Sequence, residues 1–268
     1  MVARRSQSES DRERSEDDLP DAAIDDPSES EELRLLRAEL KDAGGRLLTT
    51  SAHGIRNHIT IIQSYLEIIH SDLTAGLSDE QLSFLGIAYD HVLRLRNLID
   101  DLVLIGALET GISDLNPTRV DIGQAVTGVC TNTHEAAQRQ RVTLRCEIEN
   151  DQAVAEVDFD HYCDITRRLL DNALKFTPEG GTIVVRVFSE PAWATMSISD
   201  TGVGIPAECL GDVFDLFTQF HLRPGEPKES HGLGLPLVRR LVEASGGNIS
   251  LESTVGGGTV ATVRLPAI

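Results

Sequence analysis

Two long stretches of the chain repeat apolar residues at steps of three and four, which is the spacing of one face of an α-helix. The first stretch runs from Leu47 to Leu73 and the second from Ser78 to about Leu108. Ser78 and Gln81 have the spacing of a capping box that opens the second helix, and Gly111 is expected to end it. The pattern predicts an antiparallel helical hairpin. Because one hairpin exposes its apolar face, we expect a homodimer in which two hairpins form a four-helix bundle.

The remainder of the chain mixes shorter helices with strands. Helical spacing is found at 121–140, 159–176 and 235–245, and strand-like runs at 142–148, 182–189, 193–199, 249–253 and 259–265. Asn116-Pro117 punctuates the chain between the hairpin and this region. The predicted fold class is α+β, an N-terminal helical hairpin followed by a two-layer α/β sandwich. We expect residues 1–30 to form a disordered acidic tail, residues 31–112 the hairpin, and residues 117–268 the second domain.

The 268-residue chain carries a formal net charge of −19, and its only lysines are Lys41, Lys175 and Lys228. An acidic surface repels phosphate, so neither nucleic acid nor an anionic membrane is expected as a partner. A surface this acidic also repels itself unless salt screens it. We therefore hypothesise a host with a salt-rich cytoplasm, a halophile. The alternative is an ordinary acidic protein with a charged tail.

The sequence shows no feature of an exported or membrane-spanning chain. No apolar run reaches the roughly 20 residues that cross a bilayer, and the charged N-terminus lacks the apolar core of a signal peptide. Four cysteines, Cys130, Cys146, Cys163 and Cys209, are far apart and form no C-x-x-C pair. Neither a zinc site nor a disulfide framework is indicated. We expect a cytoplasmic protein without a membrane span.

The second domain contains four short motifs in a fixed order, beginning with LLDNALKFTPEGG from Leu169 to Gly181. Asn172 lies late on an expected helix, where its side-chain carbonyl has the chemistry to bind a hard cation such as Mg²⁺. Lys175 follows one turn later and is suited to meet a phosphate as a point charge. In isolation, either residue fits ordinary solvation at a surface equally well.

The second motif, DTGVGIP from Asp200 to Pro206, directly follows an expected strand. Asp200 is suited to accept a hydrogen bond from an exocyclic amine such as that of adenine, and Gly202 and Gly204 allow a sharp turn close to a ligand. The third motif, HGLGLPLVRRLVEASGG at 231–247, opens a helix whose free N–H groups favour phosphate. The fourth motif is GGGTV at 256–260. Each motif alone also fits a simple turn or loop.

In this order, the motifs resemble the catalytic and ATP-binding domain of histidine kinases, which belongs to the GHKL ATPase superfamily. VFDLF at 213–217 is similar to the phenylalanine box within the flexible lid of that family, here residues 206–231. The resemblance implies a sandwich of the GHKL (Bergerat) type, with ATP and Mg²⁺ as cofactors and the metal held by Asn172. It assigns nucleotide binding to Asn172, Lys175, Phe176, Asp200, Gly202, Gly204, Gly232, Leu233, Gly234, Leu235 and Thr259.

The first helix also resembles this family, because AHGIRNHIT at 52–60 is similar to its H box. His53 falls on the phosphoacceptor position, and Asn57 on the residue that orients water during phosphatase action. At about 100° per residue, His53 lies roughly 200° from Ile55 of the apolar face, so its imidazole should face solvent. Without the other motifs, a single exposed histidine would count as an ordinary surface residue. An exposed imidazole on a rigid helix can act as a nucleophile.

Four positions depart from the family pattern. Gly54 stands where an acid usually assists the histidine, and His58 replaces a proline and is a rival phosphoacceptor. Arg168 replaces the first asparagine of the N box, where it could either reach phosphate or exclude a contact with Mg²⁺. Ser230-His231 replaces the Gly-Thr that usually precedes G-L-G-L.

The resemblance implies a sensor histidine kinase of two-component systems, with the hairpin as its dimerisation and phosphotransfer domain. Such an enzyme autophosphorylates from ATP, here on His53, and passes the phosphoryl group to an aspartate in the receiver domain of a response regulator. Two alternatives are open. One is a degenerate kinase that acts mainly as a phosphatase or scaffold. The other is a GHKL ATPase of the gyrase, chaperone or mismatch-repair kind, which would lack a histidine-bearing hairpin.

Overall fold

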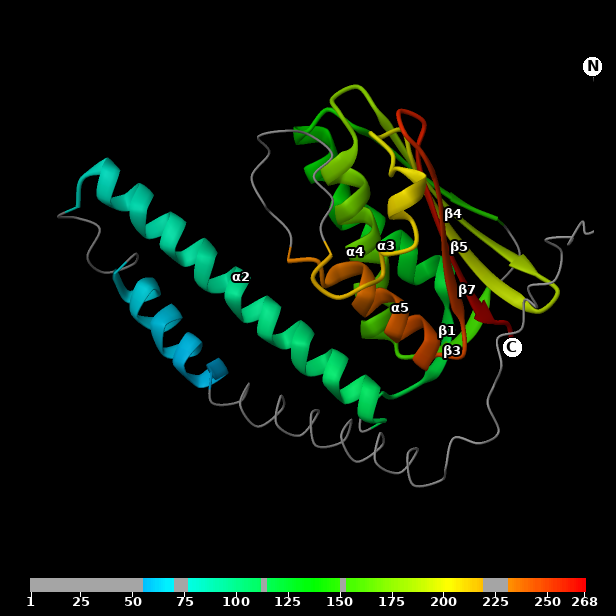
Figure 1. Ribbon diagram of the computed structural model, residues 1–268, viewed down its shortest axis with the longest axis horizontal. Coiled ribbons are helices and arrows are strands. Elements are labelled where there is room, and N and C mark those ends of the chain that lie inside the picture. The colour runs from blue at the N-terminus through cyan, green and yellow to red at the C-terminus, as the bar shows by residue number, and fades with distance from the viewer. Residues whose placement is uncertain (1–54, 70–76, 112–114, 150–152, 219–230) are drawn as a thin grey trace, which may run out of the picture. The chain divides into compact units, whose positions relative to one another are not determined.

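The computed structural model describes residues 55–69, 77–111, 115–149, 153–218 and 231–268 (Figure 1). All of these residues belong to one compact unit, Leu40–Ile268. The acidic tail, His53, Gly54 and Ser230, for which the sequence gives expectations, lie outside the described residues. Within the described part, no helix is both long enough and apolar enough to cross a membrane.

The predicted hairpin is confirmed in its described part by a helix at 55–69 and by α2, Asp79–Thr110. The Ser78 hydroxyl accepts the Gln81 N–H at 3.3 Å, and the Gln81 side chain accepts the Ser78 N–H at 2.9 Å. This is the reciprocal capping box expected from the sequence. The helix ends at Gly111, whose φ of 70° is the left-handed conformation that glycine adopts most easily.

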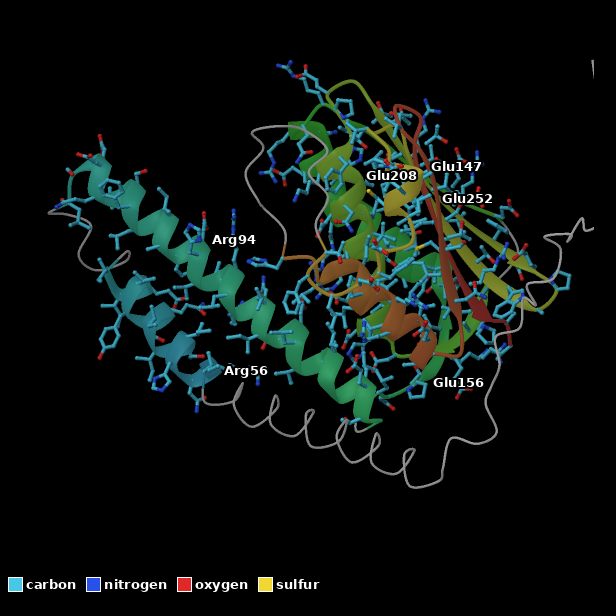
Figure 2. All side chains as sticks on the ribbon, viewed as in Figure 1. Arg56, Arg94, Glu147, Glu156, Glu208 and Glu252 are labelled. Atoms are coloured by element: carbon cyan, nitrogen blue, oxygen red, sulfur yellow. The ribbon has the colours of Figure 1, made fainter. Side chains whose placement is uncertain are left out.

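Side-chain contacts show that the two hairpin helices run antiparallel. Arg56 donates to Asp100 at 2.8 Å (Figure 2), and Tyr89 donates to Glu67 at 3.1 Å. Ile59 is buried between the helices, where it packs near Ile99, Val92 and Val103. Other large apolar side chains of the described hairpin are exposed: Ile55, Ile61, Ile62, Tyr65, Ile68, Phe84, Ile87 and Leu95. Much of the apolar surface of the described hairpin is therefore accessible to solvent.

The part of the chain after the hairpin is built on a five-stranded mixed sheet. Its strand order is β2-β4-β5-β7-β6. Only the β2–β4 pair is parallel. The strands are β2 Thr143–Ile148, β4 Thr182–Glu190, β5 Trp193–Asp200, β6 Asn248–Thr254 and β7 Gly258–Pro266. Figure 1 shows three helices on one side of this sheet: α3 Ile122–Arg139, α4 Phe159–Phe176 and α5 Gly234–Ala244. The two-layer α/β sandwich and its predicted helices and strands are confirmed.

Two short strands were not predicted, β1 Thr118–Asp121 and β3 Val154–Val157. They pair antiparallel with each other, outside the large sheet. Four residues are too few to establish an alternating pattern, so the sequence gives no strand signal at either place. The single-turn 3₁₀ helix Ala207–Cys209 also lies in a region expected to be irregular.

The start of α4 is fixed by the carboxylate of Asp158. One oxygen accepts the His161 N–H at 3.1 Å, which caps the helix, and the other accepts the Asn116 N–H at 3.0 Å. Burial acts to raise the pKa of Asp158, but these hydrogen bonds and the nearby His161 ring outweigh burial and lower the pKa. Asp158 is therefore a charged group that joins the segment at Asn116 to the first turn of α4.

Candidate functional site

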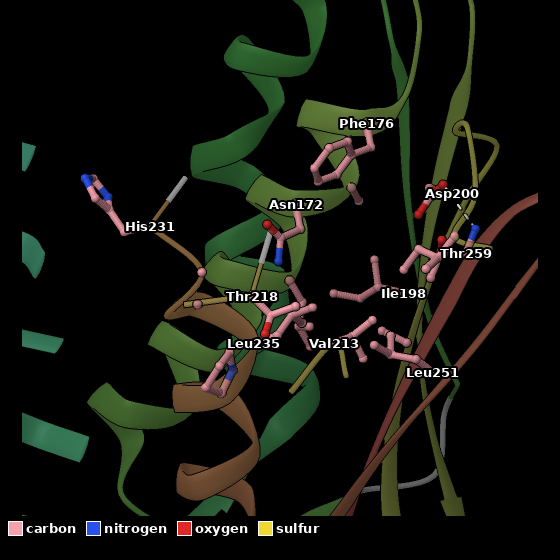
Figure 3. Close-up of a pocket in the computed structure, with 18 residues that line it drawn as sticks. Asn172, Phe176, Ile198, Asp200, Val213, Thr218, His231, Leu235, Leu251 and Thr259 are labelled. Atoms are coloured by element: carbon pink, nitrogen blue, oxygen red, sulfur yellow. Dashed lines mark hydrogen bonds between the residues drawn. The ribbon is translucent and has the colours of Figure 1, made fainter. Parts of the chain in front are cut away.

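Residues from distant parts of the chain line one cavity of about 200 Å³ (Figure 3). They come from α4, from the end of β5 and the loop after it, from the start of α5, and from β6 and β7. Ile198, Leu251 and Ala261 contribute an apolar wall from the sheet. The polar groups are few and are supplied mainly by Asn172, Asp200, Thr218, His231 and Thr259. An apolar cavity with a few oriented polar groups suits a small organic ligand.

Helix α4 supplies Leu169, Asn172, Ala173 and Phe176 to the cavity. These residues recur at steps of three and four, so they share one face of the helix. Leu169 and Ala173 are buried and hold this face against the core, while Asn172 and Phe176 are half-buried. Figure 3 shows the amide of Asn172 and the ring of Phe176 along the same side of the cavity.

Asp200 is the last residue of β5, and its carboxylate is held by two backbone donors. Oδ1 accepts the Gly202 N–H at 2.7 Å and the Thr259 N–H at 3.2 Å, the second of which is drawn in Figure 3. Burial raises the pKa of Asp200 above its ordinary value, although both hydrogen bonds act to lower it. The two backbone N–H groups therefore fix the orientation of the carboxylate, which is only partly hydrated. This arrangement suits Asp200 to accept a hydrogen bond from a ligand.

Glycine is required where the loop after β5 crosses two neighbouring strands. A Cβ on Gly204, whose φ is +71°, would lie 2.0 Å from the Thr254 carbonyl oxygen. A Cβ on Gly258, whose φ is +89°, would lie 1.9 Å from the carbonyl oxygen of Asp200. No side chain fits in either place, so these two glycines let β5, β7 and the loop approach closely enough to form the cavity wall.

Ser253 of β6 organises the polar side of this wall, although sequence reasoning missed it. Its hydroxyl donates to the Gly258 carbonyl at 2.8 Å and accepts the Ile205 N–H at 2.8 Å. It also lies 2.8 Å from the Thr259 hydroxyl. Because the single proton of Ser253 is used on a carbonyl, Thr259 must be the donor between the two hydroxyls. No local pattern marks Ser253, since all of its partners come from the tertiary fold.

The lid segment meets the cavity at Thr218 and at His231. Residues 219–230 lie outside the described part, and the residues on either side of them are joined by a hydrogen bond from the Phe217 N–H to the Gly232 carbonyl at 3.0 Å. Phe217 has a φ of 63° and Gly232 a φ of 68°, so both ends of the lid turn sharply. Helix α5 then begins at Gly234 beside the cavity and directs its free N–H groups there.

Most of the residues assigned to nucleotide binding surround this one cavity. Its lining includes Asn172, Phe176, Asp200, Gly204, Gly232, Gly234, Leu235 and Thr259. Gly202 lies beneath Asp200 as a hydrogen-bond donor, and Leu233 is buried just before α5. Lys175 is exposed, with its ammonium 5.4 Å from the centre of the Phe176 ring, and lies beside the lining residues rather than among them.

The described part of the hairpin contains Arg56, Asn57 and His58 of the H box. Arg56 is engaged by Asp100 of α2, whereas Asn57 and His58 are exposed. Asn57 therefore presents its amide to solvent on the first described turn of helix 55–69.

Arg168 forms ion pairs with two carboxylates. Its Nη2 lies 2.5 Å from Asp101 Oδ1, its Nη1 2.9 Å from Asp101 Oδ2, and its Nε 2.6 Å from Asp164. Asp101 is on α2 and Asp164 is one turn earlier on α4. The donors of Arg168 are directed to these carboxylates, so the residue joins α2 to α4. Its guanidinium group is not directed toward a phosphate or a metal position in this structure.

Two protein families match the chain in its two halves. Residues 157–268 match the family described as histidine kinase-, DNA gyrase B-, and HSP90-like ATPase. Residues 43–111 match the His Kinase A (phospho-acceptor) domain. A GHKL ATPase of the gyrase or chaperone kind would lack the phospho-acceptor domain at residues 43–111. The two matched regions are thus a histidine kinase phospho-acceptor domain followed by an ATPase domain of the kind found in histidine kinases.

Curated relatives agree with this assignment. The chain is 29% identical over 229 residues to the sensor histidine kinase TmoS of Ectopseudomonas mendocina, covering 85% of this chain and 23% of the relative. It is 30% identical over 226 residues to the circadian input-output histidine kinase CikA of Synechococcus elongatus, covering 84% of this chain and 30% of the relative. The chain thus spans less than a third of the length of either relative.

Solved histidine kinases share the fold. Full-length ShkA in complex with AMPPNP superposes with a TM-score of 0.71 at 21% identity, covering 83% of this chain and 46% of that chain. The Acinetobacter baumannii histidine kinase AdeS superposes with a TM-score of 0.58 at 21% identity, covering 80% of this chain and 98% of that chain. These likenesses show the fold, and the family match over residues 157–268 identifies the sandwich as an ATPase domain of the GHKL kind.

Proposed function

We propose that this chain is an ATP-dependent protein histidine kinase that phosphorylates its own His53 and passes the phosphoryl group to an aspartate of a response regulator. The observation that carries the proposal is the convergence of Asn172, Asp200 and Gly234 on one cavity, from three separate segments of the chain. These three residues offer an amide oxygen, a carboxylate and a helix N-terminus to the same cavity. Such a combination is not expected by chance.

In this proposal, the adenine end of ATP lies against the sheet. Asp200 accepts a hydrogen bond from the exocyclic amine of adenine, because its carboxylate is oriented by Gly202 and Thr259. Phe176 and Leu235 provide apolar surface on either side of the cavity. The base is bound mainly by burial, and one directed hydrogen bond selects it.

The phosphates extend toward the start of α5 and the lid. Gly232 and Gly234 leave the backbone N–H groups there accessible, and the helix dipole favours negative charge. Lys175 is close enough to Phe176 to reach the same rim by rotating its side chain. The free N–H groups at the start of α5, with Lys175 beside the lining, are the groups suited to accept the phosphates of a nucleotide.

The Mg²⁺ site is expected at Asn172. Within the described residues, no group of three or more acidic, histidine or cysteine side chains could hold a metal by itself. A nucleotide-bound Mg²⁺ usually takes one or two protein oxygens and completes its shell with phosphates and water. The half-buried amide of Asn172, directed along the cavity, fits that requirement. When bound, the ion neutralises charge that develops on the β- and γ-phosphates.

Transfer requires the imidazole of His53 to attack the γ-phosphorus in line with the bond to the β-phosphate oxygen. The N–P bond forms as the O–P bond breaks, ADP leaves, and the imidazole proton passes to a base or to water. The protein contributes mainly positioning and charge neutralisation. The aspartate of a receiver domain then accepts the phosphoryl group from the phosphohistidine. We place the reaction in the cytoplasm, where ATP is available.

We also propose a homodimer formed through the hairpin. The support is the set of large apolar side chains that the described hairpin leaves exposed, among them Ile62, Tyr65, Phe84 and Leu95. Pairing two hairpins would bury such a face at roughly 25 cal/mol per Å² of apolar surface. A solvent-exposed face of this size is otherwise unfavourable for a single chain.

The proposal is tested by incubating the purified protein with γ-labelled ATP. His53→Gln should abolish labelling while ADP binding stays within about twofold of the wild type, because the proposed task of His53 is to accept the phosphoryl group and not to bind the nucleotide. Asn172→Ala should lose labelling and weaken Mg²⁺-dependent nucleotide binding. His58→Gln is the matched control and should retain labelling. Label that persists in His53→Gln and disappears in His58→Gln would move the acceptor to His58, and a wild-type protein that takes up no label would contradict the kinase reaction.

A further inference from the structure

Cys130 of α3 and Cys146 of β2 lie against each other, although they are far apart in the sequence. The two thiol groups are close enough to influence each other's ionisation. Cys130 is buried and Cys146 is exposed. Strand β2 is at the edge of the sheet, so small reagents can approach Cys146 from the side that no neighbouring strand covers. Glu147, labelled in Figure 2, is the next residue on the same strand.

The register between α3 and β2 accounts for this contact. At one end, a Cβ on Gly123 would lie 2.9 Å from Ile148 Cγ2, and at the other, the Val142 N–H donates to the Ala137 carbonyl at 2.9 Å. The helix and the strand therefore run antiparallel, over about 21 Å and about 20 Å respectively. Cys146 is two residues from Ile148, so its side chain points to the same side of the strand, toward α3.

The two sulfurs have opposite environments. The hydrogen bond from the Cys130 thiol lowers the pKa of Cys146 to about 7, although partial burial acts against this. The same hydrogen bond, together with burial and the charge on Cys146, raises the pKa of Cys130. The hydroxyl of Thr127 already donates to the Gly123 carbonyl at 2.8 Å, so Cys130 is the main donor to Cys146. The negative charge therefore resides on the exposed sulfur and the proton on the buried one.

We propose that Cys146 and Cys130 form a peroxide-reactive pair, in which Cys146 attacks the oxidant and Cys130 resolves the product as an intramolecular disulfide. The Cys146 thiolate attacks one oxygen of hydrogen peroxide, so an S–O bond forms, the O–O bond breaks, and hydroxide leaves and takes up a proton. The sulfur of Cys130 then attacks Cys146, the S–S bond forms, and the S–O bond breaks. The departing hydroxide takes the Cys130 proton. Two thiols and one hydrogen peroxide thus give one disulfide and two waters.

This site is separate from the nucleotide cavity. The residues that line the cavity come from α4, α5, β5 to β7 and the adjoining loops, and none comes from α3 or β2. A disulfide would connect the edge strand to its helix without entering the cavity. Nucleotide affinity should therefore change less than about twofold on oxidation. The cross-link restricts the unfolded chain between residues 130 and 146, so the melting temperature should rise by about 5 °C.

The rate of the first step follows from the thiolate fraction. At pH 7, about half of Cys146 is ionised if its pKa is about 7, against roughly 3% for an ordinary thiol of pKa 8.5. The lower basicity makes each thiolate about five times less nucleophilic. The net expectation is modification about threefold faster than an ordinary exposed cysteine at pH 7, with a half-maximal rate near pH 7.

The experiment treats the reduced full chain with hydrogen peroxide and maps its cysteines by alkylation and peptide mass spectrometry. The wild type should form the Cys130–Cys146 disulfide. Cys130→Ala should stop at a sulfenic acid on Cys146 that dimedone traps, which separates the resolving role from the attacking role. Cys146→Ser should give neither product. Cys163→Ser is the matched control and should behave as the wild type, because burial and the charge of Asp160 raise the pKa of Cys163.

Three results would overturn the proposal. The first is Cys146 reacting no faster than Cys163. The second is a disulfide that joins only separate chains. The third is peroxide carrying Cys146 of the wild type to the sulfinic acid without any intramolecular disulfide. If Cys130→Ala is poorly folded, the alkylation rate of Cys146 in the wild type as a function of pH gives an independent test, and a midpoint above pH 8 would contradict the pairing.

Discussion

Replacing Asp200 by Asn tests the assignment of the adenine-recognising group with a minimal change in shape. The asparagine keeps one carbonyl oxygen, which can still accept the N–H groups of Gly202 and Thr259. Its other atom becomes an NH₂ donor. The exocyclic amine of adenine would then meet a donor where the carboxylate offered an acceptor. The backbone around the site should therefore be unchanged, and only the contact with the base should be lost.

The expected loss follows from the value of one hydrogen bond to a charged group, about 1.5–3 kcal/mol. This corresponds to roughly 10- to 150-fold weaker binding of ADP. Guanine carries a carbonyl where adenine carries the amine, so the variant should lose much less affinity for GDP and its preference for adenine should fall. Because burial raises the pKa of Asp200, the wild-type affinity for ADP should also decline with acidification, starting at a higher pH than for a surface carboxylate.

Isothermal titration calorimetry with ADP and GDP measures both effects, with Mg²⁺ held constant. Asp160→Asn is the matched control, since Asp160 is an exposed carboxylate at the start of α4, away from the cavity lining. Thermal unfolding of each variant shows whether the fold is retained. A change in ADP affinity of less than threefold in a folded Asp200→Asn protein, or equal losses for ADP and GDP, would refute the assignment.

Other predictions concern stability, measured by urea unfolding. A double-mutant cycle with Arg168→Asn and Asp101→Asn should give a coupling energy of about 2 kcal/mol, because the two side chains are only 18% and 15% exposed; a coupling below about 0.5 kcal/mol would contradict the ion pair. Gly258→Ala should cost about 3 kcal/mol, because its φ is positive and a backbone oxygen lies 1.9 Å from the added Cβ. Gly256→Ala has a positive φ but nothing within 4 Å, so it should cost only about 1 kcal/mol, and equal costs at the two positions would show that contact is unimportant.

The sequence predicted best those elements whose signals are local. Helix α4 was expected at 159–176 and is observed as Phe159–Phe176, because its apolar face is regular and Asp158 supplies a cap. The capping box at Ser78 and the end at Gly111 were read correctly for the same reason. The motif glycines near the cavity were found because close backbone approach leaves few other choices.

What the sequence did not reveal depends on contacts between distant residues. Ser253 acts through Ile205, Gly258 and Thr259, which only the folded sheet brings together. The pair formed by Arg168 and Asp101 spans 67 positions in the chain, so sequence reasoning did not find the carboxylate partner of this arginine. Cysteine spacing likewise gave no sign of the paired thiols, because α3 and β2 must pack before the sulfurs meet.

Asp158 joins two segments with different tasks. It accepts a hydrogen bond from Asn116, in the stretch that follows the hairpin, and it caps the helix that carries Asn172. Asn172 is fourteen residues further along α4, about 21 Å away at the rise of an α-helix. Since a helix of this length bends little, we expect a displacement of α4 along its axis through this bond to move the amide of Asn172 as well. A single carboxylate thereby couples the direction in which the chain leaves the hairpin to the position of a residue within the cavity.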